Sequence, residues 1–311
     1  MSDAAERYRQ FKEHGGVADL SGRLKLRLAG ADRVRFLNGQ VTANVTRLVA
    51  GHALPACITT AKGKLCGEAV LHATHDTLLL DADASLRESL PARLEKYIIA
   101  DDVTLDDVTG DLRLIHVLGD IAPGADLADT AVCADRAHRF GRDGWDLVLR
   151  PEVFEKVWPA MTATVAALDD ELLEIIRIEA GVPRWGRELD ENTLPPEAGL
   201  DRTHVDYHKG CYIGQEVISR LKSVGHVNRE LTGFISHGGS PLAPGARLFA
   251  PGDDEHPIGT ITSAAFSFAL EKPVALGYLK RGAGFPEVIA RSADPAGPET
   301  VVATHALPIV S

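Results

Sequence analysis

Cysteine is scarce in this 311-residue chain, which contains only Cys57, Cys66, Cys133 and Cys211. None of the four belongs to a C-x-x-C pair. A sequence so poor in cysteine does not indicate a disulfide scaffold, nor a zinc or iron–sulfur site that the chain builds alone. Composition therefore predicts small buried thiols, and the sequence assigns no role to Cys57, Cys66 or Cys133.

Long apolar runs and a surplus of basic residues are also missing. No uninterrupted apolar stretch approaches the roughly 18 residues of a membrane span. Residues 1–16 lack the basic start and apolar core of a secretory signal. The net charge is −11, whereas proteins that bind the phosphate backbones of nucleic acids normally carry an excess of basic residues. We therefore expect a cytoplasmic protein that does not enter membranes and does not bind nucleic acid directly.

The chain has the composition of a folded globular protein, with 45% hydrophobic and 25% charged residues. Its length exceeds what one compact core usually holds, so we expect two or three packed units. Strand-like and helix-like segments mix up to about residue 227, which favours an α+β body. Beyond this point the pattern is typical of a small antiparallel barrel, with short apolar runs separated by Gly, Pro and Asp. These runs lie at residues 231–235, 247–250, 258–261, 274–279, 288–290 and 301–303.

The sequence thus predicts an α+β body over residues 1–227, with a subdomain break near residue 100, and a C-terminal β-barrel domain over residues 228–311. Within the body, residues 32–37 and 85–99 are predicted to be helices, the second with Leu86, Leu90, Leu94 and Tyr97 in one apolar stripe. Strands are predicted on both sides of the tight turn at Lys62-Gly63.

The clearest helix covers residues 169–180, DDELLEIIRIEA, with acidic residues at its start and Gly181 after its end. At about 100° per residue, Glu179 falls on the apolar stripe of this helix. A carboxylate facing a core needs a partner. One interpretation is a structural role, either at a partly exposed helix end or in a pair with Arg184 or Arg187. The other is a ligand-facing carboxylate that accepts hydrogen bonds from a ring with adjacent N–H donors, such as a pterin.

The segment HKGCYIGQEVISRLKSVG at residues 208–225 places Cys211 just before a predicted helix at residues 215–221. His208, Lys209 and the helix dipole would each stabilise a thiolate there, which is the form that attacks electrophiles and binds metals. An inert packed thiol fits the spacing equally well. One thiolate cannot hold an iron–sulfur cluster alone, so a cluster bound at Cys211 would need ligands from a partner.

Several segments, in this order, resemble the YgfZ-type folate-binding proteins, relatives of the glycine cleavage T-protein. They are LAGADRVRFLNGQVTANV (28–45), TTAKGKL (59–65), FGRDGWDLVL (140–149), RIEAGVPRWGRE (177–188), PPEAGL (195–200) and KGCYIGQE (209–216). The last is the YgfZ-type signature. The resemblance implies a T-protein-like cloverleaf body that binds tetrahydrofolate or a derivative, followed by the C-terminal antiparallel β-barrel.

The same resemblance implies roles for individual residues. It maps Glu179 onto the T-protein carboxylate that contacts the pterin, and it makes Cys211 the working thiolate and a ligand of a transient, shared iron–sulfur cluster. The remaining predicted site residues surround Cys211: Lys209, Gly210, Tyr212, Gly214, Gln215 and Glu216. The implied function is an accessory role, non-catalytic or weakly catalytic, in iron–sulfur cluster assembly and repair. Its implied partners are an A-type carrier and client enzymes, including those that thiolate tRNA.

One departure from T-proteins keeps a second function open. T-proteins carry an aspartate in the strand after the turn that corresponds to Gly63, and this chain reads KGKLCGEAV there without one. Aminomethyl transfer in glycine cleavage is therefore not expected. A folate-dependent one-carbon transferase of unassigned substrate remains the alternative, with Glu68 as the nearby substitute. A cysteine-nucleophile enzyme is the weakest reading, because no motif supplies its general base.

Overall fold

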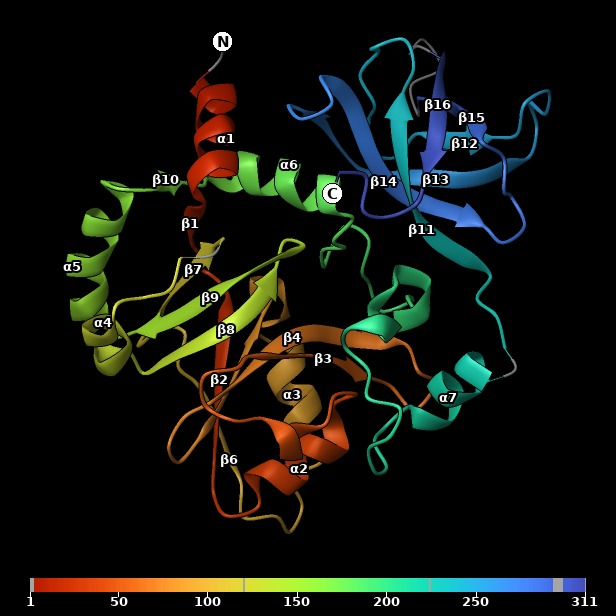
Figure 1. Ribbon diagram of the computed structural model, residues 1–311. Helices are drawn as coiled ribbons and strands as arrows, with labels where there is room; N and C mark the ends of the chain where they lie inside the picture. The colour runs from red at the N-terminus through yellow and green to blue at the C-terminus, as the bar shows by residue number, and fades with distance from the viewer. Residues whose placement is uncertain (1–2, 120, 224, 293–298, 311) are drawn as a thin grey trace.

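The computed structural model describes residues 3–119, 121–223, 225–292 and 299–310. In these residues the chain forms two five-stranded sheets and one closed six-stranded barrel. The two sheets, helix α6 and the barrel surround a common centre (Figure 1). This arrangement confirms the predicted fold class, a mixed α and β body followed by an antiparallel barrel.

The first sheet has the strand order β3-β4-β5-β2-β6 and packs against helices α2 and α3. Its elements are β2 (Leu24–Ala29), α2 (Arg33–Gln40), η1 (Val45–Arg47), β3 (Leu54–Thr59), β4 (Leu65–Ala73), β5 (Leu78–Ala82), η2 (Ala84–Leu86), α3 (Ser89–Glu95) and β6 (Thr104–Asp107). The predicted turn joins β3 to β4, where Gly63 has a φ of +75°, a value that glycine adopts without strain.

The helix predicted over residues 85–99 is shorter than expected. It consists of the 3₁₀ turn η2 and the seven-residue helix α3. Pro91 explains the break, because a proline ring is tolerated in the first turn of a helix but not in its interior. Leu90 and Leu94 are buried in the core of the first sheet, as the apolar stripe predicted.

The second sheet has the order β10-β1-β7-β9-β8 and carries helices α1, α4 and α5. Its elements are α1 (Asp3–His14), β1 (Gly16–Asp19), β7 (Arg113–Leu118), α4 (Ala125–Thr130), β8 (Cys133–Arg139), β9 (Arg142–Leu149), α5 (Pro151–Thr162) and β10 (Ala166–Ala167). The chain passes from the first sheet to the second between β6 and β7.

Helix α6 (Asp170–Ala180) links the second sheet to the rest of the molecule. The side chain of Asp169 accepts a hydrogen bond from the backbone N–H of Leu172, and Gly181 ends the helix with a φ of +74°. Both ends therefore follow the capping signals in the sequence. The helix packs against barrel strands β13 and β14 through a core that includes Ile178 and Leu276.

The barrel closes in the order β11-β14-β13-β12-β15-β16. Its strands are β11 (Arg229–Ser236), β12 (Arg247–Phe249), β13 (Pro257–Ser267), β14 (Lys272–Lys280), β15 (Glu287–Arg291) and β16 (Glu299–His305). All six predicted apolar runs therefore lie in barrel strands. The boundary predicted at residues 227/228 and the break near residue 100 stay predictions about folding units.

Two further features position the site. The segment after α6 contains the short turns η3 (Pro195–Ala198) and η4 (Leu200–Arg202), and then helix α7 (Gln215–Ser223). Beyond β16 the chain returns to α6, where the backbone N–H groups of Ile309 and Val310 donate to the carbonyl of Glu179 at 2.8 and 2.9 Å. In the described residues, no helix is long and apolar enough to cross a membrane.

Candidate functional site

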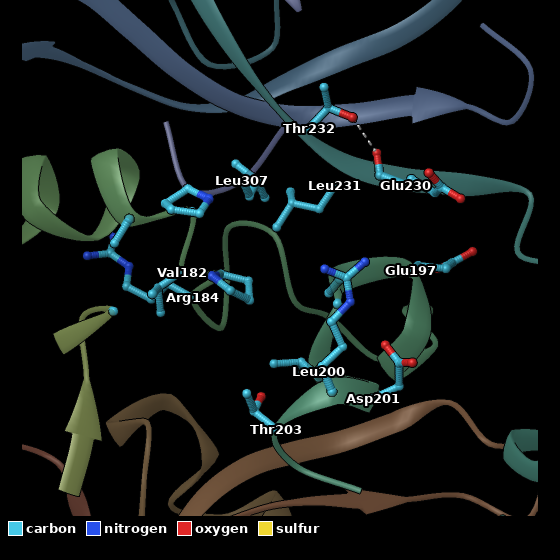
Figure 2. Close-up of a pocket in the computed structure, with 18 of the residues that line it drawn as sticks. Val182, Arg184, Glu197, Leu200, Asp201, Thr203, Glu230, Leu231, Thr232 and Leu307 are labelled. Atoms are coloured by element: carbon cyan, nitrogen blue, oxygen red, sulfur yellow. Dashed lines mark hydrogen bonds between the residues drawn. The ribbon is translucent and has the colours of Figure 1, made fainter. Parts of the chain in front are cut away.

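A cavity of about 1290 Å³ opens where the first sheet, the second sheet and the barrel meet. Residues from the segment after α6, from β11 and from the returning C-terminal segment face it together (Figure 2). Its wall includes residues 138–141, 180–185, 196–204, 230–232, 279–284 and 304–308, together with Leu20, Arg23, Pro55, Glu68, Val70 and Asp83. This volume is sufficient for a large organic ligand.

The wall combines apolar surfaces with charges of both signs. Apolar side chains such as Phe140, Trp185, Leu200 and Leu231 offer flat or extended surfaces to a ligand. The acidic residues are Glu68, Asp83, Glu197, Asp201 and Glu230, and the basic ones include Arg23, Arg139, Arg184, Arg202, Lys280 and Arg281. Such a wall suits a ligand with an apolar body and several hydrogen-bonding groups.

Glu68 is the acidic residue of this wall that comes from a strand of the first sheet. It extends from β4, and Nε2 of His204 lies 3.7 Å from its Oε1. Burial acts to raise the pKa of Glu68, but His204 and the nearby guanidinium groups of Arg23 and Arg139 outweigh it and lower the pKa below its ordinary value. Glu68 is therefore an ionised acceptor at neutral pH.

Arg139 connects the cavity wall to a buried charge network between the two sheets. Its Nε and Nη2 donate to the carboxylate of Asp146 in β9 at 2.7 to 3.0 Å, and Nη2 also donates to Asp81 of β5 at 2.6 Å. Burial acts to raise the pKa of Asp146, but Arg139, His116 and His72 outweigh it and hold the pKa far below its ordinary value.

Two histidines complete this network. Nδ1 of His116 in β7 lies 2.7 Å from Asp146. His72 of β4 crosses from the first sheet to the second, with Nδ1 at 2.8 Å from Asp135 and Nε2 at 3.5 Å from Asp146. These contacts join strands of both sheets, so the network fixes the two sheets relative to each other beneath the cavity.

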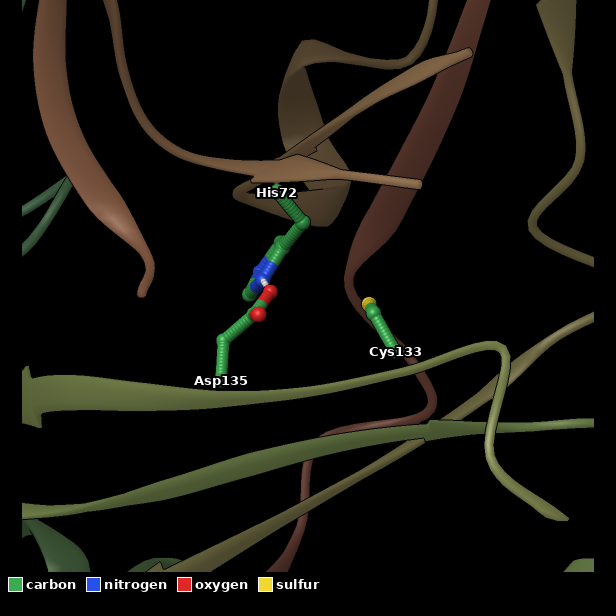
Figure 3. A group of neighbouring side chains, drawn as sticks. All are labelled: His72, Cys133 and Asp135. Atoms are coloured by element: carbon green, nitrogen blue, oxygen red, sulfur yellow. Dashed lines mark hydrogen bonds and ion pairs between the residues drawn. The ribbon is translucent and has the colours of Figure 1, made fainter. Parts of the chain in front are cut away.

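His72, Cys133 and Asp135 also gather in a way that offers three donor atoms for a metal ion, within 4.8 Å of one another (Figure 3). However, the Asp135 carboxylate already accepts from His72 and, at 2.7 Å, from the backbone N–H of Gly51. Burial raises the pKa of the Cys133 thiol well above its ordinary value. The existing hydrogen bonds account for the cluster as part of the charge network.

The buried position of Glu179 agrees with its place on the apolar stripe, since it is 5% exposed. Its carboxylate accepts hydrogen bonds from the hydroxyl of Tyr8 at 2.5 Å and from the hydroxyl of Ser267 at 2.6 Å. Of the alternatives left open by the sequence, neither the partly exposed helix end nor a pair with Arg184 or Arg187 is seen in the described residues. Among the described residues, the cavity wall includes the neighbouring Ala180 and Gly181 but not Glu179. A direct folate contact of Glu179 stays a prediction.

Cys211 is exposed, whereas Cys57 and Cys133 are buried and Cys66 is half-buried. It lies four residues before α7 begins at Gln215. Lys209 does not lie beside the thiol as predicted. Its ammonium group is buried and donates to three backbone carbonyls at the end of α2 and just beyond it, those of Asn38, Val41 and Ala43, at 2.6 to 2.8 Å. Burial lowers the pKa of Lys209 to about 8, so it stays charged at neutral pH.

The other predicted loop residues pack beside this anchor. Tyr212 is buried under Lys209, whose Nζ lies 5.2 Å from the ring centre. Gly214 has a φ of +92°, and a β-carbon there would meet Oγ1 of Thr59 at 2.5 Å, so the position requires glycine. In the described residues, none of Lys209, Gly210, Cys211, Tyr212, Gly214, Gln215 and Glu216 lines the cavity. Their folate-binding role stays a prediction.

The loop does contact another predicted motif. The carbonyl of Ile213 accepts a hydrogen bond from Oγ1 of Thr59 at 2.6 Å, and a β-carbon on Gly63 would touch Val217 of α7. The structure thus brings TTAKGKL and KGCYIGQE together at the turn between β3 and β4.

The functional analysis of the sequence missed Arg139 and its network. A signal was present, because Asp81, His72, His116 and Asp146 each interrupt an otherwise apolar strand segment. A charged residue within such a run is costly unless it is paired, so each position indicated a buried partner.

The comparisons with known proteins agree with this architecture. Residues 229–300 match the glycine cleavage T-protein C-terminal barrel domain. The chain is 26% identical to an aminomethyltransferase of Streptomyces avermitilis, covering 96% of this chain and 87% of that protein. It is 27% identical to a putative chloroplastic transferase of Arabidopsis thaliana, covering 86% of this chain and 66% of that protein.

A solved structure shares the whole fold. The crystal structure of glycine cleavage system aminomethyltransferase T from Bartonella henselae superposes with a TM-score of 0.83 at 20% identity, covering 99% of this chain and 89% of that one. Residues 229–300 therefore match the T-protein C-terminal barrel domain, and the chain as a whole shares the fold of this aminomethyltransferase structure.

Proposed function

We propose that this protein binds a reduced folate, tetrahydrofolate or a derivative, in the central cavity. The observation that best supports folate binding is the cavity of about 1290 Å³, whose wall presents both apolar surfaces and carboxylates. A pterin is a flat ring with adjacent N–H donors, and a carboxylate can accept two of them. Glu68, with its lowered pKa, is the group on this wall that best meets that description.

We further propose an accessory role in the assembly or repair of iron–sulfur clusters, with Cys211 as the working thiolate. This finer proposal is based on the KGCYIGQE signature. The construction of the loop supports it, because a buried ammonium group and a positive-φ glycine hold the exposed thiol in place. A single thiolate requires further cluster ligands, which an A-type carrier or a client enzyme would supply.

The test is complementation in cells that lack the protein, with an iron–sulfur enzyme that thiolates tRNA as the reporter. We expect wild type to restore thiolation and Cys211→Ala to fail at equal protein abundance. Cys66→Ala is the matched control, because this half-buried thiol belongs to a strand of the first sheet, and it should restore thiolation. Equal rescue by Cys211→Ala would remove the cysteine from the mechanism, and failure of the wild type would remove the pathway.

A folate-dependent one-carbon transferase is the second candidate, favoured by the position of Glu68 on the cavity wall beside His204. The relatives named aminomethyltransferase support it at the level of the superfamily. We expect slow conversion of tetrahydrofolate to methylenetetrahydrofolate with an aminomethyl donor, and a loss of about 100-fold in Glu68→Gln, the scale of a removed acid–base group. Glu230→Gln, on the opposite wall, is the control. Turnover that survives Glu68→Gln would contradict this assignment.

A further inference from the structure

Glu68 and His204 lie together on the cavity wall, and hydrogen bonds tie their backbones to each other. Glu68 pairs across the first sheet with Cys57. The backbone N–H of Cys57 donates to Oγ1 of Thr42 at 2.9 Å, and that hydroxyl donates to the carbonyl of His204 at 2.6 Å. The N–H of His204 donates to the carbonyl of Leu200 at 2.8 Å. These contacts hold the two backbone segments that carry Glu68 and His204 next to each other.

The distance between the side chains of Glu68 and His204 makes the attraction between them depend on the charge of the imidazole. The 3.7 Å between Nε2 of His204 and Oε1 of Glu68 exceeds a hydrogen-bond length but is within ion-pair range. A neutral imidazole therefore attracts the carboxylate weakly, and an imidazolium attracts it more strongly where both side chains are mostly, though not fully, buried. On the other side of the ring, Oγ1 of Thr203 lies 2.7 Å from Nδ1. A hydroxyl can donate to a neutral ring or accept from a charged one, so the ring can change its proton without moving.

Other charged groups face the pair from every element around it. Arg23 from the segment before β2 and Arg139 from β8 act on Glu68, and the neighbouring thiol of Cys57 in β3 lies near both Glu68 and Asp201 of η4. Both arginines are always charged, and burial raises the pKa of Cys57 well above its ordinary value, so its thiol stays neutral. Histidine is the side chain of this group that ordinarily titrates near neutral pH.

We propose that His204 is a positioning residue whose protonation state sets whether Glu68 is available to the N–H donors of the cavity ligand. The inference rests on folate binding in the cavity. Protonated His204 holds the carboxylate and competes with the ligand. Neutral His204 releases it. Binding of a reduced folate therefore strengthens as pH rises through the range in which histidines lose their proton.

The experiment is calorimetric titration with 5-formyltetrahydrofolate, a reduced folate that resists oxidation. We expect wild type to bind about fourfold more tightly at about pH 8 than at about pH 6, because a histidine of ordinary pKa is about one quarter neutral at the lower value. His204→Asn should bind equally at both values, with the affinity of wild type at the higher pH. The matched control is His256→Asn, which removes an exposed histidine outside the cavity wall, paired with Asp253, and should keep the full dependence. A pH dependence that persists in His204→Asn overturns the proposal.

A second measurement needs no ligand. Carbon-detected NMR follows the carboxyl group of Glu68, whose pKa His204 helps to lower. We expect that pKa to rise in His204→Asn and to stay unchanged in His256→Asn. An unchanged Glu68 in His204→Asn overturns the pairing. If the NMR result holds but 5-formyltetrahydrofolate does not bind at any pH, the folate proposal fails and the proposed control of its binding fails with it, while the pair itself stands.

Discussion

Asp146→Asn is expected to lower the free energy of unfolding by about 3–5 kcal/mol, the usual cost of breaking a buried ion pair by removing one partner. Arg139 would keep Asp81 but lose the carboxylate that it contacts through two of its nitrogens, in a site where Asp146 is fully buried. Urea unfolding followed by circular dichroism measures the change. Asp143→Asn is the control, since its pair with His138 is exposed and should contribute less than about 1 kcal/mol.

The same contacts make stability depend on acid. A carboxyl group whose pKa is lower in the folded state contributes stability above its unfolded pKa of about 3.9. That contribution disappears as the pH falls toward the folded value. Asp146 is such a group, because Arg139 outweighs the effect of burial. Wild type should therefore lose more stability between about pH 4 and pH 2 than Asp146→Asn does. Parallel losses in the two proteins would show that Asp146 is not held by this network.

Lys209→Met should destabilise the protein by about 3 kcal/mol and loosen the loop around Cys211. The substitution keeps the length of the buried side chain but removes the donor to three backbone carbonyls, and each buried acceptor left without a donor costs roughly 1–3 kcal/mol. The loop before α7 then loses its anchor. Urea unfolding measures the first effect, and faster modification of Cys211 by a thiol reagent measures the second.

The control for this substitution is Lys222→Met. Lys222 is exposed, and its Nζ lies 5.2 Å from the ring centre of Tyr207. An exposed cation–π contact of this kind contributes less than about 1 kcal/mol to stability. If Lys209→Met leaves both the stability and the rate of thiol modification at wild-type values, the buried ammonium group does not hold the loop.

Local patterns predicted much of the fold. The six barrel strands and both ends of α6 follow from apolar runs, turn residues and capping residues that lie within a few positions of one another. The helix predicted over residues 85–99 was wrong in its length. The apolar stripe continues through Pro91, but a proline ring is accepted only in the first turn of a helix, so the structure has a 3₁₀ turn followed by the short helix α3.

The candidate site was harder to predict, because its contacts join distant positions. The sequence placed Glu179 on an apolar stripe but could not identify its partners, which are Tyr8, 171 positions away, and Ser267, 88 positions away. Lys209 was expected beside Cys211 because it is close in sequence, yet its long side chain reaches the carbonyls after α2. Periodicity indicates that a polar group is buried, and only the packing of separate elements determines what it contacts.

The meeting of distant segments at Glu179 also bears on when the cavity comes into existence during synthesis. The hydroxyl of Tyr8 reaches this residue from α1, and the N–H groups of Ile309 and Val310 reach it from the returning segment. Residues 304–308 of that segment line the cavity. Ribosomes add residues in order, and so this wall emerges after all the others. A nascent chain can form both sheets while the cavity is still open on one side, and a ligand that needs every wall has nothing to bind until then.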